Sequence, residues 1–151
     1  MTSLFHPIIP KLICGVVIRT PSGWLLGRRR SSGWWDLPKG RQDKGENALG
    51  TALRECHEEF GLDLASHVDR LQDMGVGTYS GRRNRLLHVF LLDLPAAFHL
   101  SHCRPALNPQ SPEMDLFAWV SEDQVLSYVR PRLARYLLAR GLVKTSSNLP
   151  G

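Results

Sequence analysis

The sequence predicts an α/β fold in which a mixed sheet is packed between helices. Two observations lead to this prediction: short apolar, β-branched runs typical of strands, and two longer segments with an apolar stripe at helical spacing. Their order along the chain is strands, helix, strands, helix. The length of 151 residues fits a single core. We expect one domain over residues 1–143 and a polar, disordered tail over 144–151.

The first predicted strands form a hairpin. The run KLICGVVIR at 11–19 is apolar and β-branched, as expected of a buried strand. TPSG at 20–23 supplies turn residues, and WLLGRR at 24–29 is the predicted returning strand. A short extended piece, WWDLP at 34–38, leads into KGRQDKGE at 39–46, which is predicted to be a loop with glycines near both ends.

A helix is predicted from Asn47 to Phe60, with Gly61 as its C-terminal stop. The apolar residues recur at spacings of one, three and four, so they form one stripe on a helix. The members of this stripe are Ala48, Leu49, Ala52, Leu53, Cys56 and Phe60.

Two further strands are predicted at 70–79 and 84–94, joined by the basic turn SGRR. The proline-rich segment Pro95–Pro112 is long for a connection, so it either covers a site or is mobile. MDLFAWV at 114–120 is predicted to be a late strand.

A closing helix follows the late strand. Ser121 and Gln124 have the spacing of a capping box at its start. Pro131 is expected to kink or split the helix, because a proline inside a helix removes a backbone hydrogen bond.

Composition narrows the class of protein without identifying a partner. The net charge of +5 permits contact with phosphates or other polyanions but does not require it. The three cysteines are widely spaced and lack a CxxC pair, which favours a reducing compartment over a disulfide framework. We expect a cytoplasmic protein, since no apolar run approaches the ~20 residues of a membrane span and no leader pattern is present at the start.

Three glutamates cluster on one face of the first helix. Glu55, Glu58 and Glu59 are neighbours at helical spacing and border the apolar stripe. Arg54 can reach Glu58 at i+4, and the pattern leaves the other two acids without a counterion. Two interpretations remain open at this point: a solvated acidic patch, or a ligand set for a divalent cation, which prefers oxygen donors.

The longer stretch GRQDKGENALGTALRECHEEFGL, from Gly40 to Leu62, resembles the Nudix box. The box positions matched are Gly40, Glu46, Arg54, Glu55, Glu58, Glu59, Gly61 and Leu62. Cys56 departs from the usual aliphatic residue, but cysteine behaves as a small hydrophobe. The flanking elements also match in order, so the resemblance implies a Nudix-type α/β/α sandwich with a mixed central sheet.

The resemblance implies hydrolysis of a diphosphate linkage with Mg²⁺, or alternatively Mn²⁺, as cofactor. It assigns Glu58, Glu59 and Glu55 as metal ligands, with a backbone carbonyl at Gly40 or the residue before it as an additional ligand. Activation of water by such an ion, with a nearby carboxylate accepting the proton, is chemically consistent.

Two carboxylates compete for the role of general base. Glu55 belongs to the box. Glu113 stands just before the late strand, where many Nudix enzymes have a catalytic glutamate, and the alternative for it is an exposed loop acid after Pro112. Arg54 would orient the box carboxylates, and Glu46 would brace the loop against the helix.

The substrate is less well defined by the sequence. WDLPKG at 35–40 is similar to the stretch before the box in dinucleoside polyphosphate hydrolases, where the lysine contacts phosphate. Lys39 is therefore predicted to bind phosphate. Arg28, Arg29 and Arg30 are candidates for further phosphate contacts or for ordinary surface charges. Trp35 is a candidate for contact with a base.

A small-molecule nucleotide is the expected substrate, either a dinucleoside polyphosphate or a nucleoside triphosphate. An RNA 5′-triphosphate end is the alternative, since phosphate contacts dominate nucleic-acid affinity. A non-catalytic nucleotide-binding module would be expected to lose box acids, and all are present. No membrane partner is expected, and the oligomeric state is not predicted.

Overall fold

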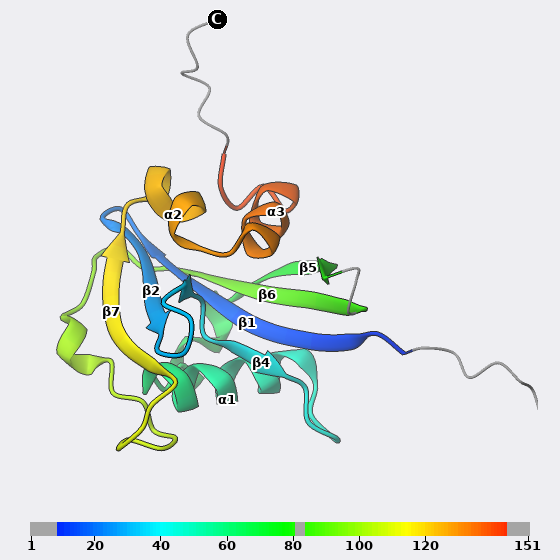
Figure 1. Cartoon of the computed structure of the whole chain (residues 1–151), viewed down its shortest axis with the longest axis horizontal. Helices are drawn as coiled ribbons and strands as arrows, with labels where there is room; N and C mark the ends of the chain where they lie inside the picture. The colour runs from blue at the N-terminus through cyan, green and yellow to red at the C-terminus, as the bar shows by residue number, and fades with distance from the viewer. Residues whose placement is uncertain (1–8, 81–83, 145–151) are drawn as a thin grey trace, which may run out of the picture.

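The structure is a computed structural model that describes residues 9–80 and 84–144, with a seven-stranded mixed sheet at its centre (Figure 1). The strands are β1 (Lys11–Thr20), β2 (Gly23–Arg29), β3 (Trp35–Asp36), β4 (Lys39–Arg41), β5 (Gln72–Ser80), β6 (Arg85–Asp93) and β7 (Met114–Val120). The helices are α1 (Ala48–Phe60), α2 (Glu122–Tyr128) and α3 (Pro131–Ala139), with two short 3₁₀ turns, η1 (Ala65–Arg70) and η2 (Leu100–His102). The predicted α/β class and mixed sheet are confirmed.

Strand β1 is the centre of the sheet, and one of its edges is shared by two strands. Its other edge pairs in parallel with β6 along its length, from Lys11 opposite Arg85 to Arg19 opposite Asp93. On the shared edge, β2 pairs only with the last two residues of β1, and β4 pairs antiparallel further back. The sheet therefore forks where β2 and β4 diverge.

Strand β4 differs from the sequence prediction, which places its residues in a loop. Gly40 lies opposite Cys14, and Gly15 lies opposite Lys39. A Cβ added to Gly15 would lie 2.7 Å from the Lys39 Cβ, so the strands approach too closely for a side chain there. This pairing depends on glycines in both strands, which reduce local strand propensity.

Helices cover both faces of the sheet, as Figure 1 shows. Helix α1 lies on one face, where a core includes Val16, Ile18 and Phe60. Helices α2 and α3 lie on the opposite face, over a core that includes Val17 and Leu137. Because side chains alternate along a strand, β1 contributes to both cores.

The predicted first helix is confirmed, together with its ends. Asn47 is the N-cap, and its Oδ1 accepts a hydrogen bond from the Gly50 N–H at 2.7 Å. Gly61 follows the last residue with φ of +69°, and its N–H donates to the His57 carbonyl at 2.9 Å. A Cβ at Gly61 would overlap the Arg104 carbonyl, so glycine is required by both conformation and space.

Pro131 splits the closing helix, as expected, and is the first residue of α3. The predicted capping box at Ser121 is wrong, because the serine side chain does not bond to the helix backbone. The Ser121 hydroxyl donates to Gln124 Oε1 at 3.2 Å instead of accepting from the helix backbone. A bond between the two side chains replaces the expected cap.

The long connection at 95–112 packs against the sheet and the end of α1. Phe98 and Cys103 join the core on the α1 side, while the N–H groups of Ala106 and Leu107 donate to the Glu58 carbonyl at 3.0 and 3.2 Å. The connection therefore closes the C-terminal end of the helix that carries the box acids.

Some expectations concern segments at the limits of the described chain. Three residues of the predicted SGRR turn, 81–83, and the predicted tail beyond Lys144 lie outside the described residues. Within the described residues, no helix combines the length and apolarity needed to cross a membrane.

Candidate active site

Glu46 and Arg54 fix the loop before α1 against the helix. Arg54 Nε donates to Glu46 Oε2 at 2.8 Å, and its NH2 donates to Glu46 Oε1 at 3.1 Å. Glu46 Oε1 also accepts from the Asp43 N–H and the Thr51 hydroxyl, each at 2.9 Å. The bond from Arg54 lowers the pKa of Glu46 to about 2.

Arg54 also holds two of the helix acids. Its NH1 group lies 3.0 Å from Glu55 Oε1 and 3.1 Å from Glu58 Oε2. The i+4 contact with Glu58 follows from helical spacing. The contact with Glu55, the next residue in the chain, requires its side chain to turn back toward Arg54. Glu55 therefore has a counterion that the sequence prediction did not anticipate.

Glu59 is held from the opposite side. It is 5% exposed, its Oε1 accepts the Lys39 N–H at 2.8 Å, and its Oε2 lies 3.3 Å from Arg29 NH2. Burial raises the pKa of Glu59 to about 8, although Arg29 opposes that rise. All three box acids thus have an arginine partner, and the prediction that two lacked a counterion is wrong. Arg29 belongs to β2 and is distant in sequence.

Gly40 makes room for the Glu55 carboxylate. A Cβ at Gly40 would overlap that carboxylate, so the helix acid rests directly against the backbone of β4. Burial raises the pKa of Glu55, with Arg54 acting in the opposite direction. The Gly40 peptide and a box carboxylate are therefore adjacent, as a shared ligand set requires.

Glu113 is brought to the same group of acids. It immediately precedes β7, and its Oε2 lies 3.4 Å from Arg29 NH1. Glu113 also favours the protonated form of Glu59, which can donate to a neighbouring carboxylate, and so contributes to the raised pKa of Glu59. The Glu113 side chain is 60% exposed. Pairing of β2 with β7 explains the proximity, since Arg29 lies opposite Met114.

The remaining substrate candidates do not contact the box acids within the described residues. Arg28 forms two 2.9 Å bonds with Asp115. Arg30 is exposed and donates to the Ser111 hydroxyl at 3.3 Å. Trp35 packs against the core on the α2–α3 side, with its ring centroid 6.0 Å from that of Tyr128.

Lys39 was expected to present its ammonium to phosphate, and the structure places it differently. The residue is 8% exposed, and its Nζ lies 2.9 Å from Asp36 Oδ2. Its Nζ is also 5.2 Å from the ring centroid of Tyr79. The backbone N–H of Lys39 reaches the acids, while its ammonium is held in a buried ion pair.

Sequence reasoning did not single out Asp36, and it considered Arg29 only as one of several possible phosphate ligands. Arg29 lies between two arginines predicted to bind substrate, yet it is the one that contacts the acids. Asp36 is 5% exposed and lies 2.6 Å from Arg29 Nε. Burial raises the pKa of Asp36, but Lys39 and Arg29 outweigh this and lower it overall. A charged residue in the otherwise apolar WWDLP stretch was the available signal.

The donor set suits a hard cation, which prefers carboxylate and carbonyl oxygens. Three box carboxylates and the Gly40 backbone supply such donors, and the absence of a side chain at Gly40 keeps the approach open. Across the described ranges, no three His, Cys, Asp or Glu side chains are already arranged around one point to hold an ion. Arg54 and Arg29 are the counterions of the acids in this conformation.

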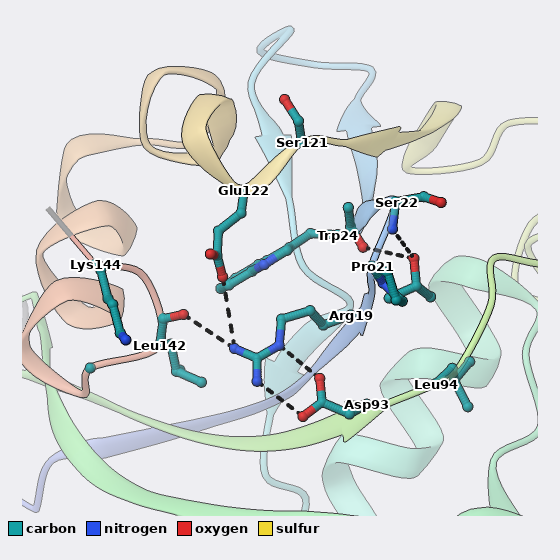
Figure 2. A pocket seen from close by; sticks show the side chains of 13 residues that line it. Arg19, Pro21, Ser22, Trp24, Asp93, Leu94, Ser121, Glu122, Leu142 and Lys144 are labelled. Carbon is teal, nitrogen blue, oxygen red and sulfur yellow. Dashed lines mark hydrogen bonds and ion pairs between the residues drawn. The ribbon is translucent and has the colours of Figure 1, made fainter. Parts of the chain in front are cut away.

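Two hollows differ in their relation to the acids. One of about 530 Å³ is lined by Arg29, Arg30 and Glu113, among others, and so adjoins the box carboxylates. Another of about 670 Å³ lies at the far end of β1, where Figure 2 shows Arg19 and Trp24. The second contains none of the predicted site residues, and we therefore place the candidate active site at the first.

Comparison with known proteins identifies the family. A family model of the NUDIX domain matches residues 10–140. The chain therefore belongs to the Nudix hydrolases, a family of pyrophosphohydrolases. It is 34% identical over 111 residues to an uncharacterized 17.7 kDa protein from the e-segB intergenic region of Enterobacteria phage T4, covering 68% of this chain and 72% of the phage protein.

Solved structures share the fold at low sequence identity. A Caenorhabditis elegans Ap4A hydrolase complex has a TM-score of 0.60 and 20% identity, covering 86% of this chain and 96% of the other. A Francisella tularensis bifunctional NMN adenylyltransferase/ADP-ribose pyrophosphatase, complexed with AMP and a Mn ion, has a TM-score of 0.65 and 18% identity. That match covers 91% of this chain and 43% of the other.

Proposed function

We propose that this protein hydrolyses the diphosphate linkage of a nucleoside diphosphate derivative with the aid of Mg²⁺ or Mn²⁺. The observation that carries the proposal is the Glu55 carboxylate resting against Gly40, with Arg54 bound to both Glu55 and Glu58 and with Glu59 on the neighbouring Lys39 N–H. Burial raises the pKa of both Glu59 and Glu55 despite their arginine partners, and a divalent cation would supply the further positive charge that favours their ionised forms.

The box residues would hold the cation through the three glutamates and the Gly40 carbonyl. A bound divalent ion would supply charge neutralisation and a more acidic water. Arg54 would keep Glu55 and Glu58 turned toward the site, since its NH1 contacts both. Either Glu55 or Glu113 would accept the proton from the attacking water. Arg29 and Arg30, at the adjoining hollow, would bind phosphate oxygens.

A dinucleoside polyphosphate or a nucleoside triphosphate is the substrate we favour. The similarity of WDLPKG to dinucleoside polyphosphate hydrolases supports the first, together with the fold shared with an Ap4A hydrolase. In this role, Lys39 would contact phosphate after leaving Asp36, Arg28 after leaving Asp115, and Trp35 would lie near the base.

An RNA 5′-triphosphate end is a second candidate, favoured by one surface. A groove of about 500 Å³ between β5 and α3 is lined by Arg132, Arg135 and Arg140, and no Asp or Glu of the described ranges lines it. Within the described residues, these three arginines have no carboxylate partner, in contrast to Arg19, Arg28, Arg29 and Arg54. Such a groove suits a phosphate chain.

The proposal also covers the bounds of the catalytic domain and the cellular compartment of the protein. We take residues 1–143 as one catalytic domain, because all described strands belong to one sheet. We also propose a cytoplasmic location, which is supported by three buried, unpaired cysteines.

The primary test is Mg²⁺-dependent nucleotide release from dinucleoside polyphosphates, nucleoside triphosphates and 5′-triphosphorylated RNA. Glu58→Gln should lower turnover by about 10- to 100-fold, since it removes one charged oxygen donor from the proposed cation site. Glu122→Gln, a surface change at the start of α2, is the control and should leave turnover intact. Unchanged turnover in Glu58→Gln would show that α1 does not provide the cation site.

A further inference from the structure

One buried carboxylate at the edge of the site is bound by two cationic side chains. Asp36 Oδ2 lies 2.6 Å from Arg29 Nε and 2.9 Å from Lys39 Nζ. Its other oxygen accepts the Leu37 N–H at 2.8 Å. The Asp36 side chain is only 7% exposed, so all of its strong partners are protein groups. This carboxylate is not one of the box acids and has no assigned role in hydrolysis.

Arg29 divides its hydrogen bonds unequally between Asp36 and the two acids beyond it. The bond from Nε to Asp36 is short, at 2.6 Å, whereas the terminal nitrogens lie 3.3 Å from Glu59 and 3.4 Å from Glu113. Charge-assisted hydrogen bonds are strongest when short. Arg29 is therefore anchored mainly by Asp36, and its contacts with Glu59 and Glu113 are loose.

We propose that Asp36 is a positioning residue that prevents Arg29 from closing on Glu59 and Glu113, so that these carboxylates remain available to a divalent cation. The inference rests on the proposed function, because it concerns the same cation site. Without Asp36, the Arg29 guanidinium would be a partly buried charge without its main partner. It would then form closer pairs with Glu59 and Glu113 and compete with the cation for their oxygens.

The test is a double-mutant cycle that reads cation affinity. Mg²⁺ binding is measured by calorimetry on the full chain for wild type, Asp36→Asn, Arg29→Gln and the double variant. Asp36→Asn should weaken Mg²⁺ binding by about tenfold. In the Arg29→Gln background the same change should have little effect, because the competing guanidinium is absent.

Two further variants distinguish a loss of Mg²⁺ affinity caused by Arg29 from a loss of the fold. Asp93→Asn removes the partner of Arg19, which Asp93 binds at 2.7 and 3.0 Å at the other end of β1 (Figure 2). Like Asp36→Asn, it removes a carboxylate that binds an arginine, and it should leave Mg²⁺ affinity unchanged. Asp36→Asn combined with Lys39→Met avoids an unpaired buried lysine, and it should show the same tenfold loss even if Asp36→Asn alone folds poorly.

A second measurement reads the Arg29–Asp36 bond directly and can be made before any cation is added. In ¹⁵N-labelled wild type, the Arg29 Nε–H should give a resolved, slowly exchanging NMR signal because it is bound to Asp36, and Asp36→Asn should abolish it. Addition of Mg²⁺ should leave the wild-type signal in place. Loss of the signal on adding Mg²⁺ would overturn the anchoring role.

The outcomes distinguish the inference from the function on which it rests. Suppose that wild type binds Mg²⁺ and that Asp36→Asn lowers the affinity equally with Arg29 present and in the Arg29→Gln background. The proposed competition by Arg29 is then wrong, but the proposed cation site is not contradicted. If wild type binds neither Mg²⁺ nor Mn²⁺, the proposed function and this inference both fall.

Discussion

The charge balance of single residues explains how three glutamates can share one helix face. Arg54 contacts Glu55 and Glu58 from within the helix, and Arg29 contacts Glu59 from β2. Like charges at this spacing would otherwise repel one another. The two guanidiniums keep the carboxylates together, yet each can shift its bonds when a stronger cation is offered. The acids are therefore held together before any ion binds.

Glu46 gives the loop before α1 a predictable dependence on pH. Its pKa is lowered from 4.5 to about 2 by the bond from Arg54. A lowered pKa in the folded state means stability that is present above pH 4.5 and lost as the pH falls toward 2. Glu46→Gln should thus be less stable than wild type at neutral pH, and the difference should shrink between pH 4.5 and 2.

The measurement is urea unfolding at several pH values in EDTA, followed by circular dichroism. Glu122→Gln serves as the control, with no trend of this size expected for an acid outside the network. A gap between wild type and Glu46→Gln that stays constant down to the lowered pKa would contradict the role given to the Arg54 bond.

Local spacing predicted only some of these residue contacts. The pair Arg54–Glu58 follows from helical geometry, and the box pattern supplied Glu46. Arg29 and Asp36 could not be found in this way, because their contacts cross between strands and leave no periodic signal. Lys39 was predicted from resemblance alone, which does not reveal that Asp36 holds its ammonium.

At the scale of elements, the C-terminal end of α1 depends on a glycine in close contact with another segment. Gly61 has φ of +69° and faces the Arg104 carbonyl, while Gly141 has the same φ and no described residue near the position of a side chain. Gly141→Ala should cost about 1–2 kcal/mol for the left-handed backbone. Gly61→Ala should cost a further ~1–3 kcal/mol, because a methyl group there must displace the 95–112 connection.

Chemical denaturation of both variants would test this difference, with unfolding free energies compared at the same temperature. Equal losses of unfolding free energy in the two variants would indicate that the close contact between Gly61 and Arg104 adds nothing to the cost of Gly61→Ala. A larger loss for Gly141→Ala would contradict the packing described for the end of α1.

Element boundaries were predictable where pattern and end signals agreed. Helix α1 has a clear apolar stripe, Asn47 at its start and Gly61 at its end, and its predicted position is confirmed. Strand β4 was missed because it has three residues and exists through its pairing with β1. The 3₁₀ turn η2 lies in a proline-rich segment whose packing is set by the surrounding core.

At the scale of the whole molecule, the distribution of basic residues bears on the RNA alternative. The net charge is +5, and the groove between β5 and α3 carries three arginines without carboxylate partners among the described residues. If 5′-triphosphorylated RNA lies there, its affinity should fall with salt. The expected slope of log K against log salt is about −0.7 for each phosphate neutralised on a single strand.

Arg135→Gln should reduce the magnitude of that slope by about 0.7 if Arg135 neutralises one phosphate. Arg19→Gln is the matched control, because Arg19 is already paired with Asp93. Binding measured by fluorescence anisotropy at several salt concentrations would show both effects. An affinity that does not change with salt would remove RNA as a substrate.

The parallel pairing of β1 with β6 has a consequence for the protein during its synthesis. The two strands are separated in the chain by β2, β3, β4, α1, η1 and β5. Their pairing joins residues 74 positions apart, as Arg19 and Asp93 show. On the ribosome, β1 is therefore completed long before its partner exists. The nascent chain then exposes an apolar strand edge, which promotes association between chains. We expect incomplete chains that end before β6 to depend on chaperones for solubility.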